Sequence, residues 1–166
     1  MIRIVVREKG GVSKVLSGLP QRLRAALMQA MQDSALHIQS LAKVYSPVFR
    51  GLLRVSIAQS VAEEGDRIVG EVGSGVVYAQ VIEEGRNPWP GPMPPPEQLR
   101  VWARRRGVAP FEPGWDMGFV LARAIKARGF RAQPYLRPAL LAAAPRVQAL
   151  FQARILEALR QEGGKD

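Results

Sequence analysis

YSPVFRGLLRVSI, residues 45–57, decides the fold that the sequence predicts, because it contains a helix end, a turn and the start of a strand. Pro47 disfavours helical geometry at Ser46, and this predicts the end of any helix that arrives from the N-terminal side. Gly51 permits a turn, since glycine adopts backbone conformations that other residues avoid. In the segment after Gly51, apolar residues occupy the odd positions, which predicts a strand with one buried face.

The strand predicted from Leu53 continues to Val61 and forms a hairpin with a second strand. The polar, glycine-containing segment 63–66 predicts the hairpin loop. The apolar residues of the return strand are Ile68, Val69 and Val72. Gly73-Ser74-Gly75 should break the pairing. Residues 77–84 predict a short helix rather than a third strand, because three of their apolar residues share one helical face. These three are Tyr78, Val81 and Ile82.

A long amphipathic helix is predicted between Pro20 and Tyr45. Proline is tolerated in the first turn of a helix, where its missing N–H costs nothing. Apolar residues then recur at spacings of three and four, which is typical of a helix with one buried face. This stripe comprises Leu23, Leu27, Met31, Ser34, Ile38, Leu41 and Tyr45. Upstream, residues 2–6 alternate with a period of two and predict a strand that Gly10-Gly11 ends.

The middle of the chain predicts a proline-rich loop followed by two helices. Six prolines between residues 88 and 96 exclude both a helix and a central strand, so we expect an extended loop of polyproline character. Pro96 should begin a short helix that Gly107 ends. Asp116 is expected to cap a second helix that Gly129 ends.

The C-terminal part predicts one more helix, starting at Pro138. Pro145 either kinks this helix or marks its true start. Its apolar stripe comprises Val147, Leu150, Phe151, Ile155 and Leu159. The order of elements then gives an α+β fold, in which an antiparallel sheet packs against the long N-terminal helix, with additional C-terminal helices and a proline-rich loop. We expect a single domain spanning 1–166, with 88–115 as an excursion of loop and short helix within it.

Composition limits the classes of protein to which the chain can belong. Its 166 residues match the usual size of one domain, and it has no cysteine, which excludes disulfides and thiolate metal sites. No apolar run approaches the roughly 20 residues that cross a bilayer. We therefore expect a soluble protein with no membrane partner and no signal peptide. The formal net charge of +10 indicates attraction to a polyanion or to an acidic protein surface.

No combination of residues predicts an enzyme, a cofactor site or a metal site. His37 is the only histidine, and no further ligands stand at helical spacing around it. Glu83 and Glu84 are adjacent, so their side chains diverge, whereas acid/base carboxylates must converge on one bond. Gly73-Ser74-Gly75 lacks the lysine and the helix start of a phosphate loop.

Two segments are candidates for contacts with other molecules. The basic cluster Arg104-Arg105-Arg106 could grip the phosphates of DNA, with Trp102 or Trp115 stacking on bases. The alternative is a solvated helix end whose arginines complement the helix dipole, with Trp102 in the core. We favour this alternative, because single-strand binders interleave aromatic and cationic residues more densely. In the proline run, the candidate contacts with other subunits or neighbours are Trp89, Pro90, Met93 and Pro94.

Several motifs in a fixed order resemble a bacteriophage family, the neck proteins (head-tail joining and tail-completion proteins) of long-tailed phages. The first is Ser46-Pro47 followed by Arg50-Gly51-Leu52-Leu53-Arg54-Val55-Ser56-Ile57, which matches the segment SP-x-x-T-G-x-L-R-x-S-I of that family. Phe49-Arg50 replaces the usual aspartate-threonine before the glycine. The later motifs are Val72-Gly73, Tyr78-Ala79, Ile82-Glu83-Glu84-Gly85, Trp102-Ala103-Arg104, Ala124-Ile125, Gly129 and Pro134-Tyr135-Leu136-Arg137-Pro138-Ala139-Leu140.

The resemblance implies a structural virion protein without catalytic residues. Many copies would form a ring at the head-tail junction, around the passage taken by DNA, and would contact the adjacent head-completion and tail ring proteins. The protein would be found in the virion, and in the host cytoplasm during assembly. The positive charges would face the lumen or lie at acidic subunit interfaces. The alternative from another class is a sequence-independent nucleic-acid-binding module, based on the charge of +10.

Overall fold

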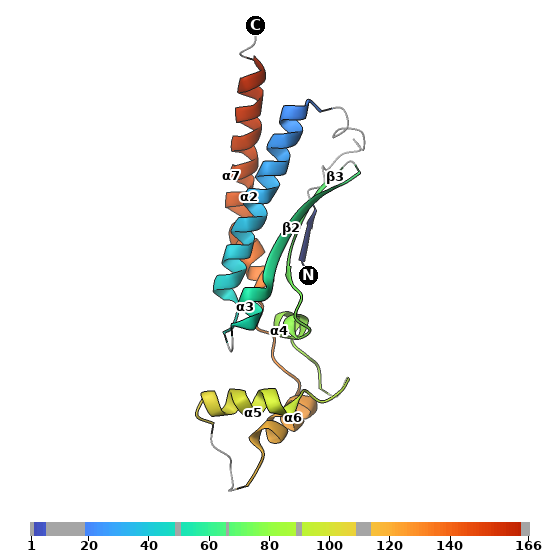
Figure 1. The fold of residues 1–166 in the computed structure, drawn as a ribbon, viewed down its shortest axis with the longest axis vertical. Helices are drawn as coiled ribbons and strands as arrows, with labels where there is room; N and C mark the ends of the chain where they lie inside the picture. Colours follow the sequence, from blue (N-terminus) through green and yellow to red (C-terminus); the bar gives the residue numbers. More distant parts are fainter. Residues whose placement is uncertain are drawn as a thin grey trace. The chain divides into compact units, whose positions relative to one another are not determined.

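The chain folds into two compact units, shown in Figure 1 as a computed structural model. One unit comprises Met1–Ala79 with Pro134–Asp166, and the other comprises Gln80–Gln133. The structure describes residues 2–5, 19–48, 51–65, 67–88, 91–108 and 114–163. The predicted α+β class is confirmed. Residues 88–115, expected as an excursion, belong to the second unit, and the expectation of one domain stays a prediction.

A three-stranded antiparallel sheet forms one layer of the first unit. Its strands are β1 (Ile2–Val5), β2 (Ile57–Glu64) and β3 (Arg67–Ser74), with β3 in the centre. The predicted hairpin is confirmed, but its turn is tighter than expected, because Glu63 and Glu64 still pair with β3. The turn contains Gly65, whose φ of 60° suits glycine. β3 also continues through Gly73 and Ser74, so the sheet ends later than the Gly73-Ser74-Gly75 motif predicted.

The predicted long helix is α2 (Gln21–Tyr45), with Pro20 immediately before its first turn. It ends where Pro47 predicts, and the Ser46 N–H donates to the Ala42 carbonyl oxygen at 2.9 Å. The expected stripe is wrong at its C-terminal end, because Tyr45 is 43% exposed. The most deeply buried positions are Ala30, Met31, Ser34, Ala35, Ile38 and Ala42. Small residues therefore form much of the buried face, and this allows close approach of neighbouring backbones.

α2 covers one face of the sheet. Met31 packs directly on Gly70 at the centre of β3, where an added Cβ would lie 2.8 Å from the Met31 Sδ. Gln39 Nε2 donates to the Ile57 carbonyl oxygen at 2.8 Å. On β2, Ile57 is buried and the even positions Ala58 and Ser60 are exposed, which confirms the predicted alternation from Ile57 onward.

The strand predicted from Leu53 to Ser56 is wrong. These residues lie in a short helix, α3 (Leu52–Ser56), that starts at Gly51 in the left-handed conformation, φ 76°. The Val55 N–H donates to the Gly51 carbonyl oxygen at 2.9 Å. Leu53 and Ile57 are both buried, and their spacing of four residues suits a helical turn as well as a strand. Val55, expected on the buried face, is 80% exposed.

The last helix, α7 (Leu136–Gly163), runs antiparallel to α2 on the side away from the sheet (Figure 1). Arg22 Nη1 donates to the Gln161 carbonyl oxygen at 3.4 Å, and Arg154 Nη2 donates to Asp33 Oδ2 at 2.9 Å. The N-terminal half of α7 therefore lies along the C-terminal half of α2. Three layers result: α7, α2 and the sheet.

Two predictions for α7 need correction. The helix begins at Leu136, two residues before Pro138, which occupies a first-turn position where a missing N–H leaves no helical bond unmade. Pro145 lies inside the continuous helix and does not mark its start. The expected stripe is wrong at Leu159, which is exposed, whereas small residues provide the buried contacts. These buried residues are Ala139, Ala143 and Ala158.

The second unit contains α4, α5 and α6, and a pair of backbone hydrogen bonds closes it. The helices are α4 (Ala79–Glu84, of which the first residue belongs to the first unit), α5 (Pro96–Arg105) and α6 (Met117–Arg128). All three were predicted. Arg86 and Phe130 exchange two backbone hydrogen bonds, each 2.8 Å. The start and the end of the unit are thus held together.

Substitution of Gly129 should destabilise the protein more than substitution of Gly107 does. Gly129 has φ 80° and ψ −171°, and an added Cβ would lie 2.3 Å from the Arg86 carbonyl oxygen. Gly107 also has positive φ, 66°, but an added Cβ would meet nothing within 4 Å. Gly107→Ala should cost about 1 kcal/mol, and Gly129→Ala about 1–3 kcal/mol more. Urea unfolding of both variants measures the difference, and equal costs would contradict the close approach.

Candidate functional site

The basic cluster lies at the C-terminal end of α5. Arg104 and Arg105 occupy the last turn, Arg106 is the C-cap, and all three are exposed. Cations at this end of a helix complement the partial negative charge of the unsatisfied carbonyls. The three arginines predicted to face DNA therefore lie together on the surface. The same position is expected if they only complement the dipole of α5, so their placement agrees with both interpretations.

The two tryptophans proposed as stacking platforms differ in exposure. Trp102 is half-buried in α5, close to the buried Ala103. Trp115 is 51% exposed and lies just before α6. Trp115 and Arg104 line one surface hollow of about 470 Å³, together with Val108 and Met117. An aromatic face and one member of the basic cluster are therefore available at the same place.

Asp116 fixes the start of α6. Its Oδ1 accepts a hydrogen bond from the Gly118 N–H at 2.9 Å, which confirms the predicted N-cap. The same carboxylate accepts from Arg100 Nε at 3.0 Å and from Arg100 Nη2. The Arg100 side chain is the largest influence, and with the backbone N–H groups it lowers the pKa of Asp116 to about 2. Asp116 is thus a structural carboxylate and no candidate acid or base.

A very close contact holds α6 against α5. An added Cβ at Gly118 would lie 2.1 Å from the Pro96 carbonyl oxygen and 3.0 Å from the Arg100 Cβ. Only glycine permits this approach between the first turns of the two helices. The surface of α6 is therefore presented by a rigid pair of helices. Beyond Trp115, this surface forms a second hollow of about 640 Å³.

In the described part of the proline run, Pro92 accepts a side-chain hydrogen bond. Arg86 Nη2 donates to the Pro92 carbonyl oxygen at 2.7 Å. Of the four residues predicted to contact other subunits, Met93 and Pro94 are half-buried, and Trp89 and Pro90 lie outside the described residues. Their role as contacts stays a prediction.

The first unit exposes apolar side chains where α2 ends and α3 begins. Val44 is 69% exposed and Val55 is 80% exposed. We call this group the α2–α3 patch, and its residues are Val44, Tyr45, Val48, Leu52 and Val55. On α7, the exposed Leu141 lies in the part of the helix opposite the end of α2. Sequence analysis missed this patch because it placed Tyr45 and Val55 on buried faces.

Two of the remaining sequence candidates, Glu84 and Ser74, make side-chain hydrogen bonds. Among the described residues, no group of three or more histidine, aspartate or glutamate side chains could hold a metal ion. Glu84 Oε2 accepts from Gln80 Nε2 at 3.0 Å on the surface of α4. Ser74 and Ser56 share a hydroxyl hydrogen bond of 2.7 Å. None of the helices in the described ranges combines the length and the hydropathy that a membrane span needs.

A comparison of the chain with protein-family profiles, with curated protein sequences and with solved structures finds no match.

The low pKa of Asp116 predicts a specific dependence on pH. An aspartate has a pKa near 3.9 in an unfolded chain, and in the folded unit it is about 2. The carboxylate therefore stabilises the fold above about pH 4, and this contribution is lost as the pH falls to about 2. In a carbon-13 NMR titration, the Asp116 carboxyl and the Gly118 amide should share one midpoint near pH 2.

Asp116→Asn provides the control for this titration. Asparagine keeps an oxygen for the Gly118 N–H but carries no charge for Arg100. The Gly118 amide of this variant should show no transition between pH 4 and 2. A wild-type carboxyl midpoint near 4 would contradict the ion pair.

Proposed function

We propose that this protein is a structural virion protein of a tailed bacteriophage, and that its copies form a ring at the head-tail junction around the DNA passage. The proposal rests on the ordered motifs that resemble the neck proteins of long-tailed phages. Its partners are other copies of itself and the adjacent head-completion and tail ring proteins. It resides in the virion after assembly in the host cytoplasm.

The structural observation that supports an association of copies is the α2–α3 patch. Three of its residues, Val48, Leu52 and Val55, belong to the same segment 46–57 that resembles the phage family. Exposed apolar side chains that gather on a protein surface mark sites of protein association. A segment that both resembles the family and exposes apolar residues is consistent with contacts between subunits.

The layered first unit also suits such a role. Its sheet, α2 and α7 form a stiff body whose ion pairs lie at the surface, between Arg24 and Glu63 and between Arg154 and Asp33. We infer that the protein acts by shape and association, as the resemblance to the phage neck proteins implies.

Introducing a charge into the α2–α3 patch should prevent assembly. Val55→Asp places a carboxylate on an exposed side chain, so the subunit should still fold but should lose the contact between copies. Light scattering of the purified protein over a range of concentrations measures the mass. We expect a mass above that of one subunit for the wild type at high concentration, and the mass of one subunit for Val55→Asp.

Leu156→Asp is the matched control for this experiment. Leu156 is also exposed, but it lies in the C-terminal half of α7, opposite the start of α2. The Leu156→Asp variant should assemble as the wild type does. The proposal fails if the wild type is a strict monomer that mass spectrometry does not detect in purified virions.

Sequence-independent binding of nucleic acid is the second candidate function. Its specific support is the hollow that Arg104 shares with the half-exposed Trp115. Phosphates could be held by the exposed cluster at the end of α5, and one base could stack on the indole. The net charge of +10 would assist the encounter.

The dependence of DNA affinity on salt tests this second function. Each phosphate contact should contribute about 0.9 to the slope of log affinity against log salt. Reversing Arg104, Arg105 and Arg106 to glutamate should flatten the slope. A matched variant that reverses the exposed Arg131, Arg146 and Arg160 to glutamate should keep most of the slope. No binding even at low salt would rule this function out.

A further inference from the structure

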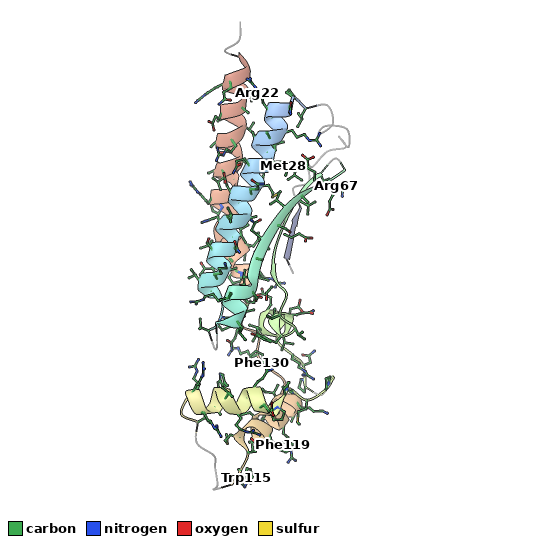
Figure 2. All side chains as sticks on the ribbon, in the orientation of Figure 1. Arg22, Met28, Arg67, Trp115, Phe119 and Phe130 are labelled. Atoms are coloured by element: carbon green, nitrogen blue, oxygen red, sulfur yellow. The ribbon has the colours of Figure 1, made fainter. Side chains whose placement is uncertain are left out.

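One face of α6 carries apolar side chains that are exposed or half-buried. Phe119, Val120, Ala124 and Ala127 recur at helical spacing and line the hollow of about 640 Å³. Phe119 is 49% exposed, although it is the largest apolar residue of this helix. We call this surface the α6 groove. Figure 2 shows Trp115 and Phe119 on the second unit, near the start of α6.

The α6 groove also carries positive charge. Arg123 and Arg128 line it and are exposed, and α6 contains no acidic residue. Among the described residues, Asp116 is the one carboxylate that lines the groove, and it is held by Arg100 and by the Gly118 N–H. Its negative charge is thus compensated locally, so the groove offers positive charge to a ligand.

The floor of the groove suits aliphatic side chains on a helix. Ala124 and Ala127 are small, so a second backbone can approach closely, while Phe119 offers an anchor beside them. Apolar residues at a spacing of three and four match the anchors of an amphipathic helix laid in a groove. The close contact between Gly118 and Pro96 holds α6 in place, which reduces the entropy lost on binding.

We propose that the α6 groove binds an acidic amphipathic helix of a partner protein. Charge complementarity selects this occupant: apolar side chains fill the floor, and carboxylates meet Arg123 and Arg128. A second copy of this chain carries the same net charge of +10 and is the poorer partner. Single-stranded nucleic acid would need a row of stacking faces, but the described lining contains no aromatic side chain beyond Trp115 and Phe119.

This inference goes beyond the proposed function, because ring formation through the α2–α3 patch does not require the α6 groove. It names a different surface, on the second unit, and a different class of partner. The two proposals can therefore fail separately, and the mass of each groove variant reports on assembly while its affinity for peptides reports on the groove.

A displayed library of random peptides of about 14 residues, long enough for several helical turns, tests the proposal with the full chain as the target. Selection should enrich peptides that carry glutamate or aspartate together with apolar residues at spacings of three and four. The enriched peptides are then synthesised, and their affinities are measured for the wild type and the variants by fluorescence anisotropy.

Two groove variants and two matched controls separate the contributions. Phe119→Ser removes the anchor, and the double variant Arg123→Glu, Arg128→Glu reverses the positive charges of the groove. Each should weaken binding at least about tenfold, which is the effect of losing an interface anchor. Leu156→Ser and the double variant Arg131→Glu, Arg146→Glu make equivalent changes at exposed positions outside the groove and should bind as the wild type does. Circular dichroism verifies that every variant is folded.

Three results would overturn the proposal. The first is a selection in which the wild type enriches no peptides beyond those that the folded Phe119→Ser variant enriches. Another is an enrichment of peptides without acidic residues, or of peptides that bind the groove variants as tightly as the wild type. The third is binding of an oligothymidine that competes with the peptides and depends on Arg123 and Arg128, which would make the groove a nucleic-acid surface.

Discussion

The packing of α2 between the sheet and α7 is the constraint on which the first unit depends. On one side, Met31 lies so close to β3 that only glycine fits at position 70 without a shift of the methionine side chain. On the other side, alanines of α2 and α7 are fully buried, so the two helices approach closely along their length. Apolar burial at this double contact is the main stabilising term, and the exposed ion pairs add little to it.

The second unit is stabilised differently, because its short helices cannot build a large core. Close backbone contacts supplement its apolar burial: Arg86 with Phe130 at the closure, and Gly118 with Pro96 between α5 and α6. The cap at Asp116 then sets where α6 begins. This arrangement leaves side chains such as Trp115 and Phe119 on the surface, available to other molecules.

The proposed contacts with other molecules depend on the side chains that each unit leaves exposed. The first unit buries its small residues and exposes valines and a leucine at the end of the α2–α7 pair, a pattern suited to association. The second unit combines exposed arginines with an apolar helix face. The strongest perturbation of a pKa among the described groups, at Asp116, arises from an ion pair with Arg100 and from the helix cap.

The sequence by itself determined the order of elements apart from α3, the ends of α2, α5 and α6, and the hairpin, because proline, glycine, capping residues and period-two patterns act locally. It also identified the arginine cluster, since charge at a helix end is visible in the sequence. Only the tertiary structure decided that Leu53 belongs to a helical turn, because its spacing from Ile57 satisfies both periods. Likewise, which apolar residues stay exposed depends on where α7 and the sheet cover α2, and long-range packing alone sets that.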